Sequence, residues 1–212
     1  MIIAVAHNKG GVGKTTATVQ LAGELKPDLI IDQDAHQGIA IINARRPAEQ
    51  RWSVLAGLNK SELIKELNGS GNKLILIDCG GFDSELTRIA IAAADLIICP
   101  SNDDITEQIG LVRFNKVLSE ISKAADTTIT ANVLMTRTNP SRKNFSAISE
   151  AIDSLPHLRM MSSKLSRRAD FSIQMEYGLG VTERAATRSS EAGKEVVVMV
   201  NEVREKLANP TI

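Results

Sequence analysis

A glycine-rich loop near the start of the chain has the composition of a phosphate-binding site. Its residues, 8–16, have the sequence NKGGVGKTT and follow the apolar run IIAVA. Glycines let successive backbone N–H groups converge on phosphate oxygens, and a helix that starts at the loop adds its positive dipole end. Lys14 would supply a charge to the β and γ phosphates, and the Thr15 hydroxyl would ligate Mg²⁺. The loop therefore predicts binding of a nucleoside triphosphate with magnesium.

The loop departs from the usual phosphate-loop pattern G-x-x-x-x-G-K-[ST] at its start. Asn8 replaces the first glycine, and a second lysine, Lys9, follows it. The run KGGVGKTT resembles the deviant Walker A motif of the ParA/MinD family of ATPases, and the resemblance extends through most of the chain. It implies that Lys9 reaches across a dimer interface and stabilises charge that develops on the γ-phosphoryl group of the other subunit. The alternative is a solvated loop lysine.

Three acidic residues end predicted strands. Asp78 terminates the apolar run LILI, as a Walker B acid does, and could hold Mg²⁺ directly or through water. Asp32 and Asp34 resemble part of the family's D-x-D-P-Q segment, although alanine and His36 replace its proline and glutamine and Gln37 follows. The resemblance implies that Asp34 orients or activates the attacking water and that Asp32 supports the Mg²⁺ shell or the loop geometry. The roles of His36 and Gln37 stay open, with a surface position favoured for His36.

Other loops complete the expected nucleotide site. Gly80 and Gly81 would let the backbone approach the γ-phosphate and change conformation after hydrolysis. Thr136 and Arg137 resemble the family's nucleotide-base and dimer-contact loops, with a plain loop as the alternative. The residues expected to contact the nucleotide are Lys9, Gly10, Gly11, Val12, Gly13, Lys14, Thr15, Thr16, Thr136 and Arg137. The candidate catalytic residues are Lys9, Lys14 and Asp34, and the candidate metal ligands are Thr15, Asp32 and Asp78.

The last third of the chain is its basic part. Residues 137–212 hold 12 basic and 9 acidic residues, whereas residues 1–136 hold 13 and 16. Lys164, Arg167 and Arg168 precede a G-x-x-V-x-E pattern at 178–183, as in small ParA proteins, and are the candidate DNA-binding residues. Lysine and arginine contacts to phosphates supply most sequence-independent affinity for DNA. With 3% aromatic residues, contacts to the DNA backbone are expected rather than base stacking. An ordinary solvated surface is the alternative.

Short apolar runs alternate with segments of helical periodicity. Strands are expected at residues 2–6, 29–31, 74–77, 96–99 and 132–135, with a weaker candidate at 158–161. Helices are expected at 14–25, 61–67, 84–94, 105–121, 146–155, 168–177 and 190–207. The run VVVMV could form a strand, but its polar flanks favour a helix closed by Asn209 and Pro210. The alternation predicts an α/β, P-loop NTPase-like fold with a mostly parallel sheet and helices on both faces. We expect one domain, 1–212, without an N-terminal helix-turn-helix extension.

The composition excludes several classes of protein. Among 212 residues, 43% are hydrophobic and 24% charged, which excludes a disordered chain, a collagen-like fibre and a disulfide-dense scaffold. No apolar stretch approaches the roughly 20 residues that span a bilayer, and the start of the chain does not resemble a signal peptide. Cys79 and Cys99 are expected to be buried and reduced, and their spacing does not suit a metal-cluster ATPase. A cytoplasmic protein is expected.

The resemblance implies a function as well as a fold. It implies a slow ATPase that uses ATP and Mg²⁺, forms a homodimer on ATP, binds DNA non-specifically at the nucleoid and leaves on hydrolysis. Its role would be plasmid or chromosome partition, with a centromere-binding ParB-type adaptor and no membrane partner. One alternative is a MinD-like membrane-associated positioning ATPase, which the proline-broken tail disfavours. Another is a ParA-like accessory ATPase for conjugative or T-DNA transfer or the positioning of other cargo.

Overall fold

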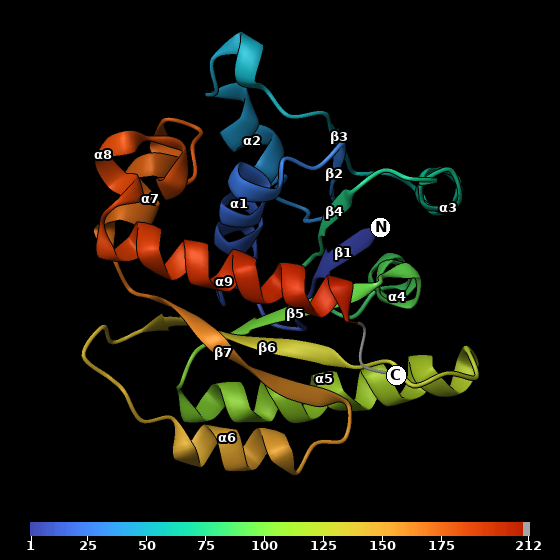
Figure 1. Ribbon diagram of the computed structural model, residues 1–212. Helices are drawn as coiled ribbons and strands as arrows, with labels where there is room; N and C mark the ends of the chain where they lie inside the picture. Colours follow the sequence, from blue (N-terminus) through green and yellow to red (C-terminus); the bar gives the residue numbers. More distant parts are fainter. Residues whose placement is uncertain (210–212) are drawn as a thin grey trace.

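Seven short segments form one parallel β-sheet in the computed structural model, which describes residues 1–209 apart from the side chain of Ile105 (Figure 1). The strands are β1 (Ile2–Val5), β2 (Leu29–Asp32), β3 (Val54–Ala56), β4 (Ile75–Asp78), β5 (Leu96–Ser101), β6 (Ala131–Thr138) and β7 (Leu158–Ser166). Their order across the sheet is β3-β2-β4-β1-β5-β6-β7, and every neighbouring pair is parallel. The predicted α/β fold with a parallel sheet is confirmed.

Helices cover both faces of the sheet. They are α1 (Lys14–Leu25), α2 (Gly38–Ala44), α3 (Lys60–Asn68), α4 (Glu85–Ala93), α5 (Ile105–Ala124), α6 (Ser146–Asp153), α7 (Ala169–Glu176), α8 (Ala185–Arg188) and α9 (Glu191–Ala208), with short 3-10 turns at Ala48–Gln50 and Val181–Glu183. One core lies between the sheet and α3, α4, α5 and α6. The other lies between the sheet and α1, α2, α7 and α9 (Figure 1). Because β1, β2, β4 and β5 are buried along their whole length, their sequences are nearly continuous apolar runs rather than alternating ones.

The register of the sheet brings the expected site residues to one edge. Val5, the last residue of β1, pairs with Asp78 at the end of β4, and Asp78 also pairs with Asp32 at the end of β2. The glycine-rich loop starts directly after β1. In open α/β sheets, ligands bind beyond the carboxyl ends of the strands, where the strand order reverses. The phosphate loop and the acidic residues therefore meet at the edge where a ligand is expected.

Strand β3, helices α2 and α8 and both 3-10 turns were not expected from the sequence, and strand β7 is longer than expected. Strand β3 has only three half-buried residues, so its apolar signal is weak. Helix α2 starts after Gln37, whose backbone is left-handed (φ 48°). Strand β7 continues beyond the expected 158–161 through Ser162 and Ser163, whose backbone N–H groups donate to Glu202 of α9 at 3.0 and 2.8 Å. Contacts distant in sequence stabilise this extension, and periodicity does not report them.

Two further expectations concern the helices and the cysteines. The run VVVMV lies within α9, so the helical interpretation is confirmed, while Pro210 lies outside the described residues. Cys79 and Cys99 are free and buried, as expected, and burial raises the pKa of Cys79 to about 12. Of the helices within residues 1–209, none combines the length and apolar character needed to span a membrane.

Candidate functional site

The glycine-rich loop ends at the N-terminus of a helix that no side chain caps. Gly11 and Gly13 have φ values of 77° and 98°, in the left-handed region that glycine adopts without strain. Helix α1 begins at Lys14 immediately after them, and no side-chain hydrogen bond caps it at Gly13. Its first backbone N–H groups are therefore left for an anion, where the helix dipole also favours negative charge.

Asp78 lies directly behind the loop, bonded to two threonines. Its carboxylate accepts hydrogen bonds from the hydroxyls of Thr15 at 2.8 Å and Thr18 at 3.1 Å. Complete burial raises the pKa of Asp78 to about 7, although the Thr15 hydrogen bond opposes the shift. Thr18 was not among the expected site residues, although it lies one helical turn after Thr15 on the same face.

These oxygen donors fit Mg²⁺ shared with a nucleotide. Within residues 1–209, no group of three histidine, cysteine or acidic side chains is arranged to hold a metal on its own. Nucleotide-bound Mg²⁺ takes one or two protein oxygens and completes its octahedron with phosphates and water. Thr15 and Asp78 can supply such oxygens, directly or through water.

The two acids at the end of β2 have different surroundings. Asp32 is buried, and its oxygens accept backbone N–H groups from Asp34, Ile39 and Ala40 at 3.2, 2.9 and 3.1 Å. Burial raises the pKa of Asp32 against the effect of these bonds. Of its two expected roles, this arrangement favours loop geometry over a place in the Mg²⁺ shell. Asp34 instead lines the cavity, and its Oδ1 accepts the N–H of His36 at 2.9 Å.

Lys9 does not point into the cavity. Its Nζ forms an ion pair with Glu107 of α5, whose side chain is 2% exposed, and lies 3.2 Å from the Thr106 hydroxyl. The aliphatic part of Lys9 passes close to Gly110, one turn further along α5. Nothing in the sequence indicated this pairing, because Glu107 belongs to no motif and lies 98 positions away.

Lys14 and Gly81 complete the loop's surroundings. The Lys14 Nζ donates to the carbonyl of Lys9 at 2.9 Å, across the space that the loop encloses. A Cβ atom on Gly81 would lie 3.2 Å from Gly10 Cα and 3.4 Å from the Lys14 Nζ. A side chain at this position would push against the Gly10 backbone, so glycine allows the segment to lie close to the phosphate-binding loop.

The loop opens into a cavity of about 620 Å³. Gly10, Gly11, Gly13, Lys14, Thr15, Thr16, Asp34, His36, Thr136 and Arg137 form its polar side. Val12 is buried beneath the loop. Leu165, Phe171 and Met175 form an apolar wall that no sequence motif indicated. Thr136 and Arg137 line the cavity. The Arg137 side chain donates to the Gly11 carbonyl at 2.5 Å, and the Thr136 hydroxyl lies 2.6 Å from the Val12 carbonyl and 3.2 Å from that of Ser101.

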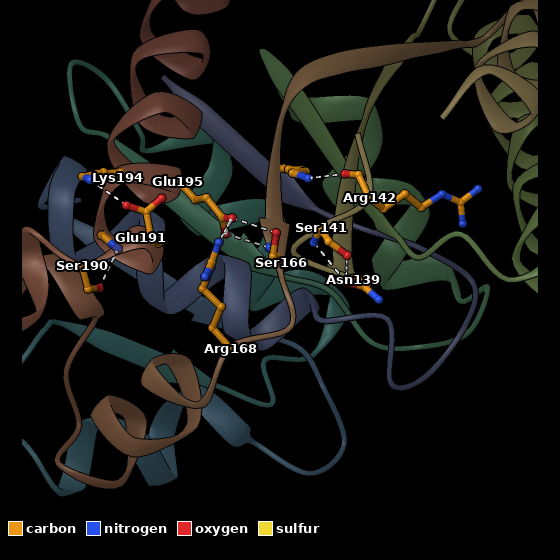
Figure 2. Close-up of polar contacts among 11 residues, drawn as sticks. Asn139, Ser141, Arg142, Ser166, Arg168, Ser190, Glu191, Lys194 and Glu195 are labelled. Carbon is orange, nitrogen blue, oxygen red and sulfur yellow. Dashed lines mark hydrogen bonds and ion pairs between the residues drawn. The ribbon is translucent and has the colours of Figure 1, made fainter. Parts of the chain in front are cut away.

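The three candidate DNA-binding residues do not form one patch. Arg168 forms an ion pair with Glu195 of α9 at 2.9 Å, and Glu195 also accepts the backbone N–H and hydroxyl of Ser166 (Figure 2). Lys164 lies within β7 and donates to the carbonyl of Arg142 at 2.7 Å. Arg167 and Arg168 line the cavity. The structure thus brings the two arginines to the candidate nucleotide site and leaves Lys164 beside the loop that follows β6.

Comparison with known proteins places this site in a family context. The sequence profile of the VirC1 protein family matches residues 1–207. "Protein ParA" of Rhizobium radiobacter is 24% identical over 146 residues, and this match covers 66% of the present chain and 66% of that relative's length. Apo McdA of Cyanothece superposes with a TM-score of 0.71 at 15% identity, covering 95% of this chain and 98% of McdA. MinD of Pyrococcus horikoshii, complexed with Mg-ADP, superposes with a TM-score of 0.68 at 18% identity, covering 98% and 97%. The inferred resemblance to the ParA/MinD family is confirmed.

Proposed function

The chain belongs to the VirC1 protein family, and from this premise we propose that it is a ParA/MinD-type ATPase that dimerises on ATP and Mg²⁺ and positions DNA. The observation that supports this most directly is Asp78, buried behind an uncapped helix N-terminus and bonded to the Thr15 hydroxyl. Because the same site would serve any cargo, the DNA could be a replicon in partition or the DNA moved in conjugative or T-DNA transfer.

In this proposal, the loop and the other residues that line the cavity have separate tasks. The backbone N–H groups at the start of α1 bind phosphate oxygens, and Lys14 exchanges the Lys9 carbonyl for the β and γ phosphates. Bound Mg²⁺ would neutralise phosphate charge. Asp34, on the cavity wall, orients the attacking water. The apolar wall of Leu165, Phe171 and Met175 lines the same cavity as the loop and suits the nucleotide base.

Lys9 connects turnover to dimerisation. In this single chain it pairs with Glu107 and so contributes nothing to its own cavity. If it acts on the phosphates of a second copy, the complete catalytic set exists only in the dimer, and slow basal turnover follows. A DNA-bound adaptor of the ParB type would then stimulate hydrolysis and release the dimer from the nucleoid.

The first test is ATP-dependent dimerisation. With Mg²⁺ and a non-hydrolysable ATP analogue, the wild type should sediment as a dimer, and with ADP as a monomer. Lys14→Ala should lose nucleotide affinity by at least about tenfold, because it removes a charge-assisted contact to phosphate. A wild type that binds the analogue yet stays monomeric would exclude the sandwich dimer.

Asp34→Ala separates hydrolysis from nucleotide binding, which Lys14→Ala tests. It should bind the analogue and dimerise as the wild type does, while the rate of phosphate release falls by about a hundredfold or more, because only the group that orients water is removed. Normal hydrolysis by this variant would remove Asp34 from the catalytic set.

A further inference from the structure

Arg137 occupies an irregular position at the end of β6. The register between β6 and β7 shifts between Thr136 and Thr138, so that Arg137 is an extra residue in the ladder. Its φ is 55°, in the left-handed region that side-chain-bearing residues rarely adopt. Bulges of this kind redirect a side chain, and strained backbone persists where the surrounding structure requires it.

The bulge directs the Arg137 side chain onto the phosphate-binding loop. Its Nη1 donates to the Gly11 carbonyl at 2.5 Å, and the neighbouring Thr136 hydroxyl donates to the Val12 carbonyl at 2.6 Å. No other described group donates to either carbonyl. Both peptide units that lead into Gly13 are therefore anchored from β6, which lies two strands away from β1 in the sheet.

Anchoring these carbonyls also fixes the direction of two donors. In a planar trans peptide, the N–H of the next residue points opposite to the carbonyl. Holding the carbonyls of Gly11 and Val12 toward β6 therefore turns the N–H groups of Val12 and Gly13 away from β6. The glycines at Gly11 and Gly13 (φ 77° and 98°) could adopt many other conformations, so an external restraint reduces the conformational entropy cost of binding phosphate.

We propose that Arg137 is a positioning residue that holds the phosphate-binding loop in its ligand-ready conformation, rather than a contact to the nucleotide base. The inference rests on the proposed nucleotide function, which it deepens by assigning the restraint to a residue outside the loop. Thr136 acts in the same way on the adjoining peptide.

Affinity for two ligands separates this role from a base contact. Inorganic tripolyphosphate with Mg²⁺ contains the phosphates of ATP but no base or ribose. We expect Arg137→Ala to bind ATP and tripolyphosphate more weakly by the same factor, about tenfold, since one charge-assisted hydrogen bond is removed. Arg137→Lys should weaken binding less than Arg137→Ala. Arg159→Ala, which removes an exposed arginine near the amino-terminal end of β7, far along the strands from Arg137, should bind both ligands as the wild type does.

Loop order in the ligand-free protein separates positioning from a direct contact to phosphate. NMR order parameters of the Val12 and Gly13 amides should fall in Arg137→Ala from the rigid range, about 0.85, toward the flexible range below about 0.6. Arg137→Gly tolerates a φ of 55° without strain, so it should show the same decrease with the bulge intact.

Each other outcome has a definite meaning. Weaker binding of ATP alone would make Arg137 a base contact, and weaker binding of both ligands with unchanged order parameters would make it a direct phosphate contact. Unchanged binding and order would also overturn the proposal. A wild type that binds neither ligand would instead contradict the proposed function, while the order parameters of the free protein would still test the restraint.

Discussion

Lys9 is held by Glu107, a carboxylate that has no other cationic partner among residues 1–209. Glu107 is almost fully buried, and its Oε2 has no hydrogen-bond partner among the described groups. Moving Lys9 to the phosphates of a second copy leaves this carboxylate uncompensated, at a cost on the order of 2 kcal/mol once the partial exposure of the lysine is allowed for. In the proposed dimer, Glu107 would therefore compete with the nucleotide for Lys9 and raise the protein concentration at which dimers form.

Glu107→Gln should remove this competition while preserving shape. We expect half-maximal dimerisation with the ATP analogue at a protein concentration at least about thirtyfold lower, since about 2 kcal/mol is recovered for each lysine, measured by sedimentation equilibrium. Glu120→Gln removes a more exposed carboxylate from the same helix and should leave dimerisation unchanged. If Glu107→Gln weakened dimerisation as much as Lys9→Ala does, the carboxylate would belong to the dimer contact itself.

For single residues, the sequence predicted which side chains carry the chemistry better than it predicted the contacts that hold them in place. The loop lysine, its threonine and the strand-ending acids occupy fixed places in recognisable patterns, so Lys14, Thr15 and Asp78 could be selected directly. Glu107 and the bonding role of Arg137 depend on contacts between residues about 100 or more positions apart. No local pattern encodes such contacts.

Among the elements, the edge strand β7 depends on helix α9. Glu202 accepts the N–H groups of Ser162 and Ser163 and the Ser162 hydroxyl, at 3.0, 2.8 and 3.0 Å. These bonds satisfy edge groups that could otherwise pair with another chain. Burial acts to raise the pKa of Glu202, but the hydrogen bonds from the two serines outweigh it and the pKa is lowered.

The lowered pKa of Glu202 predicts that the free energy of unfolding depends on pH. Because the pKa of Glu202 in the folded state lies below its ordinary value of 4.5, its stabilisation is present above pH 4.5 and declines as pH falls through the folded-state pKa. Relative to Glu202→Gln, the wild type should gain about 1–2 kcal/mol in free energy of unfolding near pH 7, and this difference should shrink below pH 4.5. Urea titrations at several pH values would measure it. Glu205→Gln, an exposed change on the same helix, should show no such pH-dependent difference.

Elements were predictable where burial alone determines them. Strands β1, β2, β4 and β5 are apolar because they are covered on both faces, and α9 shows its buried face at Val196, Met199, Val200 and Val203. Helix α2 instead starts where Asp32 accepts the N–H groups of Ile39 and Ala40. The second half of β7 depends on Glu202 in the same way. The hydrophobic periodicity of the sequence therefore predicted neither helix α2 nor this part of β7.

Across the whole molecule, ion pairs neutralise much of the positive charge that the residue count assigned to the last third of the chain. Arg168, Arg188 and Lys194 form ion pairs with Glu195, Glu24 and Glu191. A separate basic cluster remains around Phe145, where the Arg142 guanidinium and the Lys164 ammonium each lie 5.3 Å from the ring centre. Lys143 is exposed beside them, whereas Arg142 also pairs with Asp103. This cluster, of Arg142, Lys143 and Lys164, is the better candidate for contacts to DNA phosphates.

The cluster predicts a charge-dependent effect on DNA binding that leaves dimerisation intact. In the ATP-bound dimer, Lys143→Glu with Lys164→Glu should weaken binding to every duplex by a similar factor, about tenfold or more. The slope of log affinity against log salt should fall by about one for each DNA phosphate that the variant no longer neutralises. Lys65→Glu with Lys73→Glu changes the net charge equally at exposed positions on α3 and before β4, and should have little effect. Fluorescence anisotropy with two unrelated duplexes at several salt concentrations would measure the affinity and its salt dependence.

Equal weakening in the two double variants would mean that net charge, not this surface, governs binding. A wild-type dimer that ignores duplex DNA at low salt but sediments with anionic vesicles would replace DNA positioning by the membrane-associated alternative.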